Sequence, residues 1–219
     1  TAWVDRLVRG FRRKQRSMPW RTKPADPYAV WVSEIMLQQT QVATVIPYFN
    51  RFIARFPDVA TLAAAPESAV LKAWEGLGYY SRARNLWRAA GVVMRTFAGR
   101  LPVTAAALRE LPGIGAYTAA AIASIVHGEA VPVVDGNVLR VMARFLGIRE
   151  DMRKAGPLRR CREYLQGVIP RRAPGNFNQA LMELGATVCT PRQPRCAACP
   201  LQPDCVAWAR GWTAELPVR

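Results

Sequence analysis

The chain has 219 residues and a formal net charge of +16, because 31 Lys and Arg residues outnumber 15 Asp and Glu residues. Such an excess of positive charge favours a polyanionic partner, and nucleic acid is the leading candidate. The single histidine, His127, excludes a metal site built from several histidines, and no apolar run reaches the roughly 18 residues that a membrane span needs.

The first half of the chain predicts helices separated by proline-rich turns. Large apolar side chains recur on one face of residues 1–18, which predicts an amphipathic basic helix. Three prolines make residues 19–28 a turn-rich connector. Residues 29–52 predict one long helix that Pro47 bends or ends.

Glu34 lies on that long predicted helix with Val30, Trp31 and Leu37 one turn away. A carboxyl group among apolar neighbours has its charged form disfavoured, so it can carry a proton at neutral pH and act as a general acid. The alternative is a surface glutamate on a poorly phased helix.

The rest of the chain continues as short helices, and each break carries Gly or Pro. The only strand-like run, residues 131–134, is too short to form a sheet, so the pattern predicts an all-α fold. His127 is expected to end a helix. The predicted helices are residues 59–64, 66–76, 81–98, 104–111, 116–127, 136–147, 155–167 and 176–188.

Residues 111–115 form a G-x-G turn between two of these helices. Gly113 and Gly115 allow a tight turn whose backbone N–H groups are exposed where the next helix begins, and such a helix start binds anions, here a DNA phosphate. The alternative is an ordinary turn. Together with the positive charge and the cysteines described below, the run indicates a helix-hairpin-helix DNA-binding element.

Asp135 stands where the helix of residues 136–147 should begin. One interpretation is an N-cap. The other is functional, since the positive end of a helix keeps a carboxylate ionised, and that anion stabilises a positively charged sugar in a transition state. The two interpretations are compatible. Glu34 and Asp135 are then two carboxyl groups in contrasting environments, a pattern typical of acid and base pairs.

Four cysteines near the C-terminus have the spacing C-x6-C-x2-C-x5-C. Thiolates are the ligands that zinc and iron–sulfur clusters share, but zinc sites usually show two C-x2-C pairs. One such pair with a longer spacing on each side favours a 4Fe–4S cluster over zinc, free thiols or disulfides. Thiols and a cluster in turn indicate a reducing intracellular compartment, which is the cytoplasm or nucleoid if the source is bacterial. Cys161 lies outside the pattern and is expected to be a small buried side chain. The four residues are Cys189, Cys196, Cys199 and Cys205.

Several segments together resemble the adenine DNA glycosylases of the helix-hairpin-helix superfamily. The resemblance implies a monofunctional enzyme that removes adenine mispaired with 8-oxoguanine or guanine in double-stranded DNA, after the base has left the stack. It covers almost the whole chain, from Pro19 to Cys205. The segments are residues 31–45, 76–86, 111–115, 134–138 and 177–186, with the cysteine loop.

The resemblance also implies catalytic roles. Glu34 protonates the departing adenine and helps to activate water, and Asp135 stabilises the oxocarbenium ion or briefly bonds to it. Asn137 orients Asp135, and Tyr117 completes the pocket on the sugar side.

Four further positions match residues that touch DNA in the family. Arg21 and Gln179 correspond to contacts with the extruded adenine. Gln39 and Tyr79 correspond to residues that push into the duplex around the partner base. The alternative for all four is core or surface packing.

The implied architecture has two lobes. A six-helix lobe of residues 22–134 contains the hairpin, and residues 1–21 and 135–219 form the cluster lobe. DNA is expected to bind across the cleft between them, with Glu34 facing Asp135. The cluster is expected to be structural and to hold a loop whose Arg192 and Arg195 reach phosphates.

Other functions stay open at this point. Endonuclease III-like lyases carry a Lys where this chain has Tyr117, so lyase chemistry is not expected. Thymine mismatch glycosylases share that Tyr, so a thymine or uracil mismatch glycosylase stays an alternative. A non-catalytic DNA-binding iron–sulfur protein would also explain the charge and the cysteines. We expect a monomer without a membrane partner. The chain stops 14 residues after Cys205, so we also expect the family's 8-oxoguanine-reading C-terminal domain to be absent from it.

Overall fold

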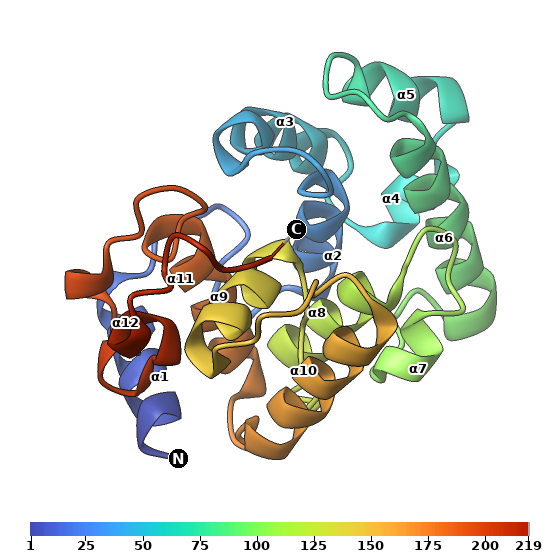
Figure 1. Ribbon diagram of the computed structural model, residues 1–219. Coiled ribbons are helices and arrows are strands. Elements are labelled where there is room, and N and C mark those ends of the chain that lie inside the picture. The colour runs from blue at the N-terminus through green and yellow to red at the C-terminus, as the bar shows by residue number, and fades with distance from the viewer. Residues whose placement is uncertain (219) are drawn as a thin grey trace. The chain divides into compact units, whose positions relative to one another are not determined.

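The computed structural model describes residues 1–218, and within this range every regular element is a helix (Figure 1). The predicted all-α fold class is therefore confirmed. The strand-like residues 131–134 run as extended chain without a strand partner, and His127 caps the C-terminus of its helix as expected. Among residues 1–218, no helix combines the length and the apolar character that crossing a bilayer requires.

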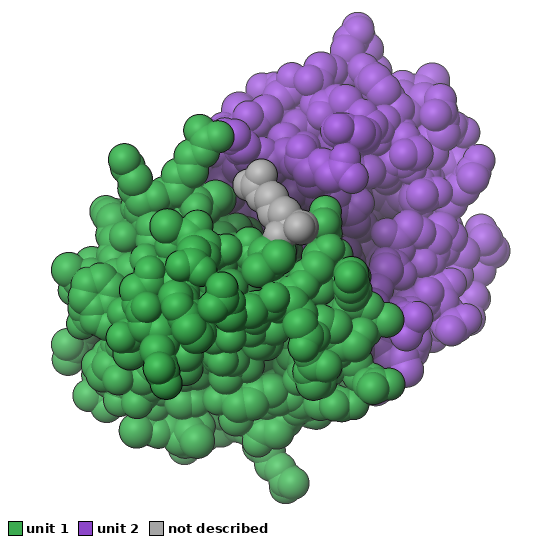
Figure 2. All heavy atoms as spheres, viewed as in Figure 1, with its two compact units in different colours: residues 1–16, 128–219 green, residues 17–127 purple. Residues whose placement is uncertain are grey.

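The chain forms two compact units, shown in different colours in Figure 2. Residues 17–127 make one unit, and residues 1–16 together with 128–219 make the other, so the second unit contains both the N-terminal and the C-terminal segments. Each unit has its own buried core and is described here by itself.

The central helix of the 17–127 unit is α2, and its side chains from Tyr28 to Met36 are all buried. It is apolar nearly all round, which is typical of a helix in a protein interior. Asp26 caps it by accepting hydrogen bonds from two backbone N–H groups. Helices α3, α6 and α8 pack around it. The helices of this unit are α2 Pro27–Met36, α3 Val42–Arg55, α4 Val59–Ala64, α5 Glu67–Trp74, α6 Ser81–Phe97, α7 Ala105–Leu108 and α8 Ala116–Val126.

The prediction of one long helix over residues 29–52 is wrong, because the chain leaves the helix at residues 37–41 and starts α3 afterwards. Pro47 lies inside α3 and does not end it. The break depends on a distant side chain. Arg82 of α6 donates hydrogen bonds to Ile35 O and Met36 O, which satisfies the carbonyl groups at the end of α2 without a further helical turn.

The second unit joins the N-terminal helix to the last third of the chain. Helix α1 packs against α11, which in turn packs against α9. Trp3 of α1 contacts Phe145 and Phe177, with ring centroids 4.9 and 5.8 Å apart, so the core includes both ends of the sequence. The helices are α1 Ala2–Lys14, α9 Gly136–Leu146, α10 Ala155–Val168, α11 Pro174–Thr187, the short 3-10 turns η1 Cys196–Ala198 and η2 Gln202–Asp204, and α12 Val206–Arg210.

Candidate functional site

Asp135 is the N-cap of α9, as one interpretation of the sequence predicts. Its Oδ1 accepts a hydrogen bond from Val138 N at 2.7 Å, and its Oδ2 accepts one from Asn137 Nδ2 at 3.0 Å. Both oxygens are thus acceptors, which stabilises the ionised carboxylate. The side chain remains half-exposed at the positive end of the helix. Two hydrogen bonds therefore hold this carboxylate in one orientation.

The segment that leads to Asp135 is fastened to α11. The buried Asn178 side chain accepts from Val133 N at 3.0 Å and donates to Val131 O at 2.9 Å. Further along α11, a Cβ atom added to Gly185 would lie 2.9 Å from the backbone oxygen of Asn137. The start of α9 therefore rests directly on the α11 backbone, and only glycine permits that approach.

Arg140 links this helix start to the cysteine segment. Its Nη2 donates to Asn137 Oδ1 at 2.8 Å and to Gly185 O at 2.7 Å, while its Nε donates to Cys189 O at 2.8 Å. Asp135, Asn137, Arg140 and Cys189 thus form one continuous chain of hydrogen bonds. This chain connects the carboxylate to the backbone of the first cysteine.

Glu34 is only 6% exposed and lies on the central helix α2 between side chains that are also buried. The alternative of a surface glutamate is therefore wrong. Helix α8, which carries the half-buried Tyr117, packs directly against α2. Burial disfavours a carboxylate, so this environment contrasts with that of Asp135. Glu34 belongs to the 17–127 unit and Asp135 to the other unit, so their meeting across a cleft stays a prediction.

The G-x-G turn lies between α7 and α8 of the 17–127 unit. Gly113 has φ +77°, and a Cβ atom there would lie 2.6 Å from Asn85 Cβ, so both its conformation and its surroundings require glycine. Gly115 is exposed and is the N-cap residue of α8. Leu111 and Ile114 are buried and anchor the turn from inside. The glycines thus stand at an exposed helix start, the geometry that suits a phosphate group.

The two residues expected to enter the duplex, Gln39 and Tyr79, are both exposed and both have left-handed backbone conformations, with φ of 58° and 49°. Arg21 and Gln179 are half-buried. Arg21 belongs to the 17–127 unit and Gln179 to the other. The roles of these four residues stay predictions.

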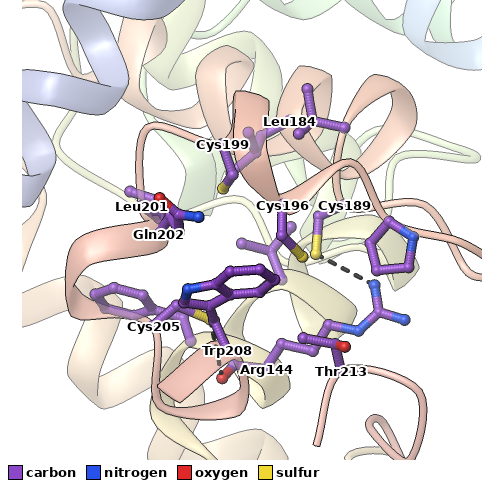
Figure 3. Close-up of a pocket in the computed structure, with 14 residues that line it drawn as sticks. Arg144, Leu184, Cys189, Cys196, Cys199, Leu201, Gln202, Cys205, Trp208 and Thr213 are labelled. Atoms are coloured by element: carbon purple, nitrogen blue, oxygen red, sulfur yellow. Dashed lines mark hydrogen bonds between the residues drawn. The ribbon is translucent and has the colours of Figure 1, made fainter. Parts of the chain in front are cut away.

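The four cysteines of the C-terminal loop line one pocket, shown in Figure 3. The pocket contains about 400 Å³ of empty space, including space open to solvent. Cys189 follows α11, Cys196 begins the first 3-10 turn, Cys199 follows that turn, and Cys205 precedes α12. All four side chains are half-buried thiols without a disulfide. The structure therefore gathers the predicted ligand set around one space.

Buried Arg144 braces this pocket from α9. Its Nη1 donates to Cys189 Sγ at 3.4 Å, the contact drawn in Figure 3, and to Thr190 O at 2.7 Å. Its Nη2 donates to Pro191 O at 3.1 Å, and its Nε to Leu216 O at 2.8 Å. One guanidinium group therefore ties the loop to the C-terminal segment and places positive charge beside a sulfur ligand.

The thiols disfavour one another's ionisation. Burial raises the pKa of the Cys199 thiol to about 11, and the charges of the other three cysteines add to the shift. Burial and neighbouring thiolates likewise raise the pKa of Cys196 and of Cys205. Four thiolates therefore need a cationic group among them. Among residues 1–218, no three His, Cys, Asp or Glu side chains are close enough to hold a single metal ion, so the predicted cluster stays a prediction.

The two arginines of the cysteine loop are exposed, as the prediction of phosphate contacts requires. Arg195 also has a structural task, because its Nη2 donates to Thr187 O at the end of α11. Arg192 supports the turn through its carbonyl oxygen, which accepts from Thr190 Oγ1 at 3.0 Å.

Three residues of the site were not predicted: Arg140, Arg144 and Gly185. A local signal existed for Arg140, since a position three residues after Asn137 lies one helical turn away. Gly185 lies inside a segment that carries the resemblance, but its contact is made with a helix far away in sequence. Nothing in the pattern distinguishes Arg144 from the other arginines of this basic chain.

The chain is similar in sequence to proteins of a known family. The model of the family described as HhH-GPD superfamily base excision DNA repair protein matches residues 32–166. The adenine DNA glycosylase of Mus musculus is 44% identical over 100% of this chain, and that of Homo sapiens is 45% identical over 96%. The chain spans 45% and 40% of the length of these two relatives.

Solved structures show the same fold. A thermostable thymine-DNA glycosylase matches with a TM-score of 0.84 at 27% identity, over 95% of both chains. A non-covalent endonuclease III–DNA complex matches with a TM-score of 0.78 at 21% identity, over 95% of this chain and 94% of that one.

Proposed function

Because the chain belongs to the HhH-GPD superfamily of base excision DNA repair proteins, we propose that it is a monofunctional DNA glycosylase that removes adenine mispaired with 8-oxoguanine or guanine. Relatives between 37% and 45% identical over most of the chain carry the name adenine DNA glycosylase. The excess of positive charge and the exposed hairpin glycines support double-stranded DNA as the partner.

The contrast between two carboxyl groups carries the proposal. Glu34 is buried on an apolar helix, surroundings that suit a general acid, and Asp135 accepts two hydrogen bonds at the positive end of a helix, surroundings that suit an anion. A glycosidic bond needs both forms, an acid for the leaving group and an anion for the cation that develops on the sugar.

In the proposed reaction the extruded adenine accepts the proton of Glu34 at N7. The electrons of the bond between the sugar carbon and N9 pass to the base, and adenine leaves neutral. Asp135 stabilises the oxocarbenium ion, with Asn137 holding its Oδ2. Glu34, now ionised, takes a proton from the attacking water, which restores the enzyme. Tyr117, on the helix that packs against α2, completes the sugar side of the pocket.

We further propose that the four cysteines hold a 4Fe–4S cluster. The four cysteines line one pocket, and their spacing, with a single C-x2-C pair and wide arms, favours a cluster over one zinc ion. Thiolate ligands carry negative charge, and the Arg144 guanidinium beside Cys189 places positive charge next to one of them. When bound, the cluster would cross-link the loop. The proposed reaction itself uses Glu34 of α2 and the residues Asp135 and Asn137 at the start of α9.

The test of the proposed function is a single-turnover assay on three duplexes that contain A:8-oxoguanine, A:G or T:G, with alkali cleavage to reveal abasic sites. We expect adenine release, reduced at least about 10²-fold by Glu34→Gln, the usual contribution of a general acid. The matched control is Glu110→Gln, an exposed glutamate of the same unit. Preferential release of thymine would reject adenine as the substrate and favour the activity for which the similar thymine-DNA glycosylase is named. An adduct trapped with borohydride would indicate a lyase.

The cluster has its own test. Protein purified without oxygen should be brown and contain about four irons and four sulfides per chain, the composition of such a cluster. Cys199→Ser should lower that content, whereas Cys161→Ser, outside the pocket, should leave it unchanged. A colourless protein with one zinc ion would overturn the assignment.

A further inference from the structure

Arg82 is an arginine buried inside the 17–127 unit, and it binds two segments that are far apart in sequence. It lies on α6, is 7% exposed, and stacks within 5.6 Å of the centre of the Trp74 ring. Its two terminal nitrogens point to different places. Nη1 binds the chain after α2, and Nη2 binds the turn before α6.

The first segment is residues 35–40, which end α2 and lead to α3. Arg82 Nη1 donates to Met36 O at 2.7 Å, to Ile35 O at 3.3 Å and to Thr40 Oγ1 at 3.2 Å. It also donates to Gln38 O. Gln39 lies between these anchored residues, exposed and in a left-handed conformation with φ 58°.

The second segment is residues 76–79, the G-x-G-Tyr turn. Arg82 Nη2 donates to Leu77 O at 3.3 Å and to Gly78 O at 3.2 Å. Tyr79 follows directly, 59% exposed, with φ 49°, and its ring centre lies 5.2 Å from the guanidinium carbon. Gly78 O also accepts from Trp74 Nε1 at 3.1 Å.

The turn favours glycine at its first residue. Gly76 has φ 91°, and a Cβ atom there would lie 2.4 Å from Tyr48 Oη. Left-handed conformations of non-glycine residues are strained and persist only where the surroundings impose them. In both segments, the guanidinium of Arg82 supplies that constraint.

We infer that Arg82 is a positioning residue that presets Gln39 and Tyr79 together for entry into the duplex. The inference rests on the proposed function, in which these two residues push between base pairs. An inserted side chain that is already ordered loses less conformational entropy on binding. A planar fork with five donors can hold two segments at once, whereas the single nitrogen of a lysine cannot span them.

The test separates duplex entry from chemistry. Adenine excision is measured under single turnover on an intact A:8-oxoguanine duplex and on the same strands with mismatched flanking pairs, so that the adenine is already unstacked. Arg82→Lys should slow excision about 10-fold or more on the intact duplex, because the protein must supply the cost of unstacking there. On the pre-opened duplex the loss should be less than about 3-fold. The matched control is Arg88→Lys, an exposed arginine of the same helix.

Equal losses on the two duplexes would overturn the inference, because a damaged fold or a damaged catalytic site slows both. If Arg82→Lys does not fold, Thr40→Val removes a single contact of the guanidinium and should show the same selective loss in smaller measure. Adding Tyr79→Ala to Arg82→Lys should cost less than Tyr79→Ala costs in the unaltered protein, and a fully additive loss would also contradict the inference. Failure of the unaltered protein to release adenine from either duplex would instead reject the proposed function.

Discussion

Asn137 holds Asp135 through a side-chain hydrogen bond, with Nδ2 3.0 Å from Oδ2, and its own amide oxygen accepts from Arg140 at 2.8 Å. The amide therefore has one orientation, since a flipped group would place two donors face to face. Arg140 in turn binds the backbone oxygens of Gly185 and Cys189. A carboxylate at the start of α9 is thus positioned by a network that reaches the cysteine loop.

Changing Arg140 should therefore impair the proposed reaction more than DNA binding. Arg140→Gln cannot contact Asn137 and Cys189 together, so Asp135 gains freedom. We expect the single-turnover excision rate to fall about 10-fold, because small displacements of catalytic groups cost that much or more. The dissociation constant for duplex DNA, measured by anisotropy, should change less than about 3-fold, the effect of one charge. Arg159→Gln, which changes an exposed arginine of α10, is the control for the loss of one charge, and an equal fall in excision rate in that variant would contradict the network.

Asp135 has a capping role and a proposed catalytic role, and two substitutions separate them. Asp135→Asn keeps an acceptor for Val138 N, so the free energy of unfolding should change by less than about 1 kcal/mol. Excision should nevertheless fall at least about 10²-fold, because the anion is lost. Asp135→Ala should lose both functions, with a destabilisation of about 1 kcal/mol. If the Asp135→Asn protein is active, the catalytic role is rejected and Asp135 keeps only its role as the N-cap of α9.

Gly185 should not tolerate a methyl group. A Cβ atom would lie 2.7 Å from Asn137 Cβ and 2.9 Å from Asn137 O, and neither a backbone atom nor a Cβ atom can move aside as a flexible side chain could. Gly185→Ala should therefore lower the free energy of unfolding by about 1–3 kcal/mol, the cost of overpacking, and should also slow excision by displacing Asn137.

The control for Gly185 is Gly167→Ala in helix α10, where an added Cβ meets nothing within 4 Å. That change should be neutral or slightly stabilising, since alanine is the better helix former. Thermal unfolding of the three proteins followed by circular dichroism gives the comparison. Equal melting temperatures would contradict the close approach of α9 and α11.

Cys161 should resist alkylation until the solution is strongly alkaline. The residue is fully buried, and burial raises the pKa of its thiol to about 11 from a usual value near 9. A raised pKa keeps the thiol protonated, so at pH 8 only about one molecule in 10³ carries the reactive thiolate. Iodoacetamide pulses analysed by mass spectrometry should show labelling at least about 10²-fold slower than in the denatured chain, rising as the pH approaches 11. Rapid labelling at pH 8 would mean that Cys161 is accessible.

The features that the sequence predicts correctly depend on residues close together in the chain. Asp135 follows a strand-like run and precedes a helical period, so its N-cap role is readable from neighbours. The cysteine spacing and the G-x-G turn are equally local. The burial of Glu34 is also indicated locally, because apolar residues surround it at helical spacing.

The long helix expected over residues 29–52 shows where local reasoning fails. The sequence has no helix-breaking residue at positions 37–41, where the helix ends. Pro47 is a strong helix-breaking signal, but it lies inside α3 and does not end that helix. The decisive group is the guanidinium of Arg82, more than 40 residues away in sequence. It binds the carbonyl groups at the end of α2 that a further helical turn would have used, and hydrophobic periodicity gives no sign of this contact.

By itself, the sequence determined the all-α fold class, the four-cysteine loop and the candidate carboxyl pair, since each follows from periodicity, spacing or immediate neighbours. Tertiary structure decided how α2 ends, why α9 can rest on Gly185, and which of the many arginines are buried. Those outcomes depend on hydrogen bonds and close contacts between segments distant in sequence, and 31 cationic residues look alike until folding desolvates a few of them against carbonyl oxygens.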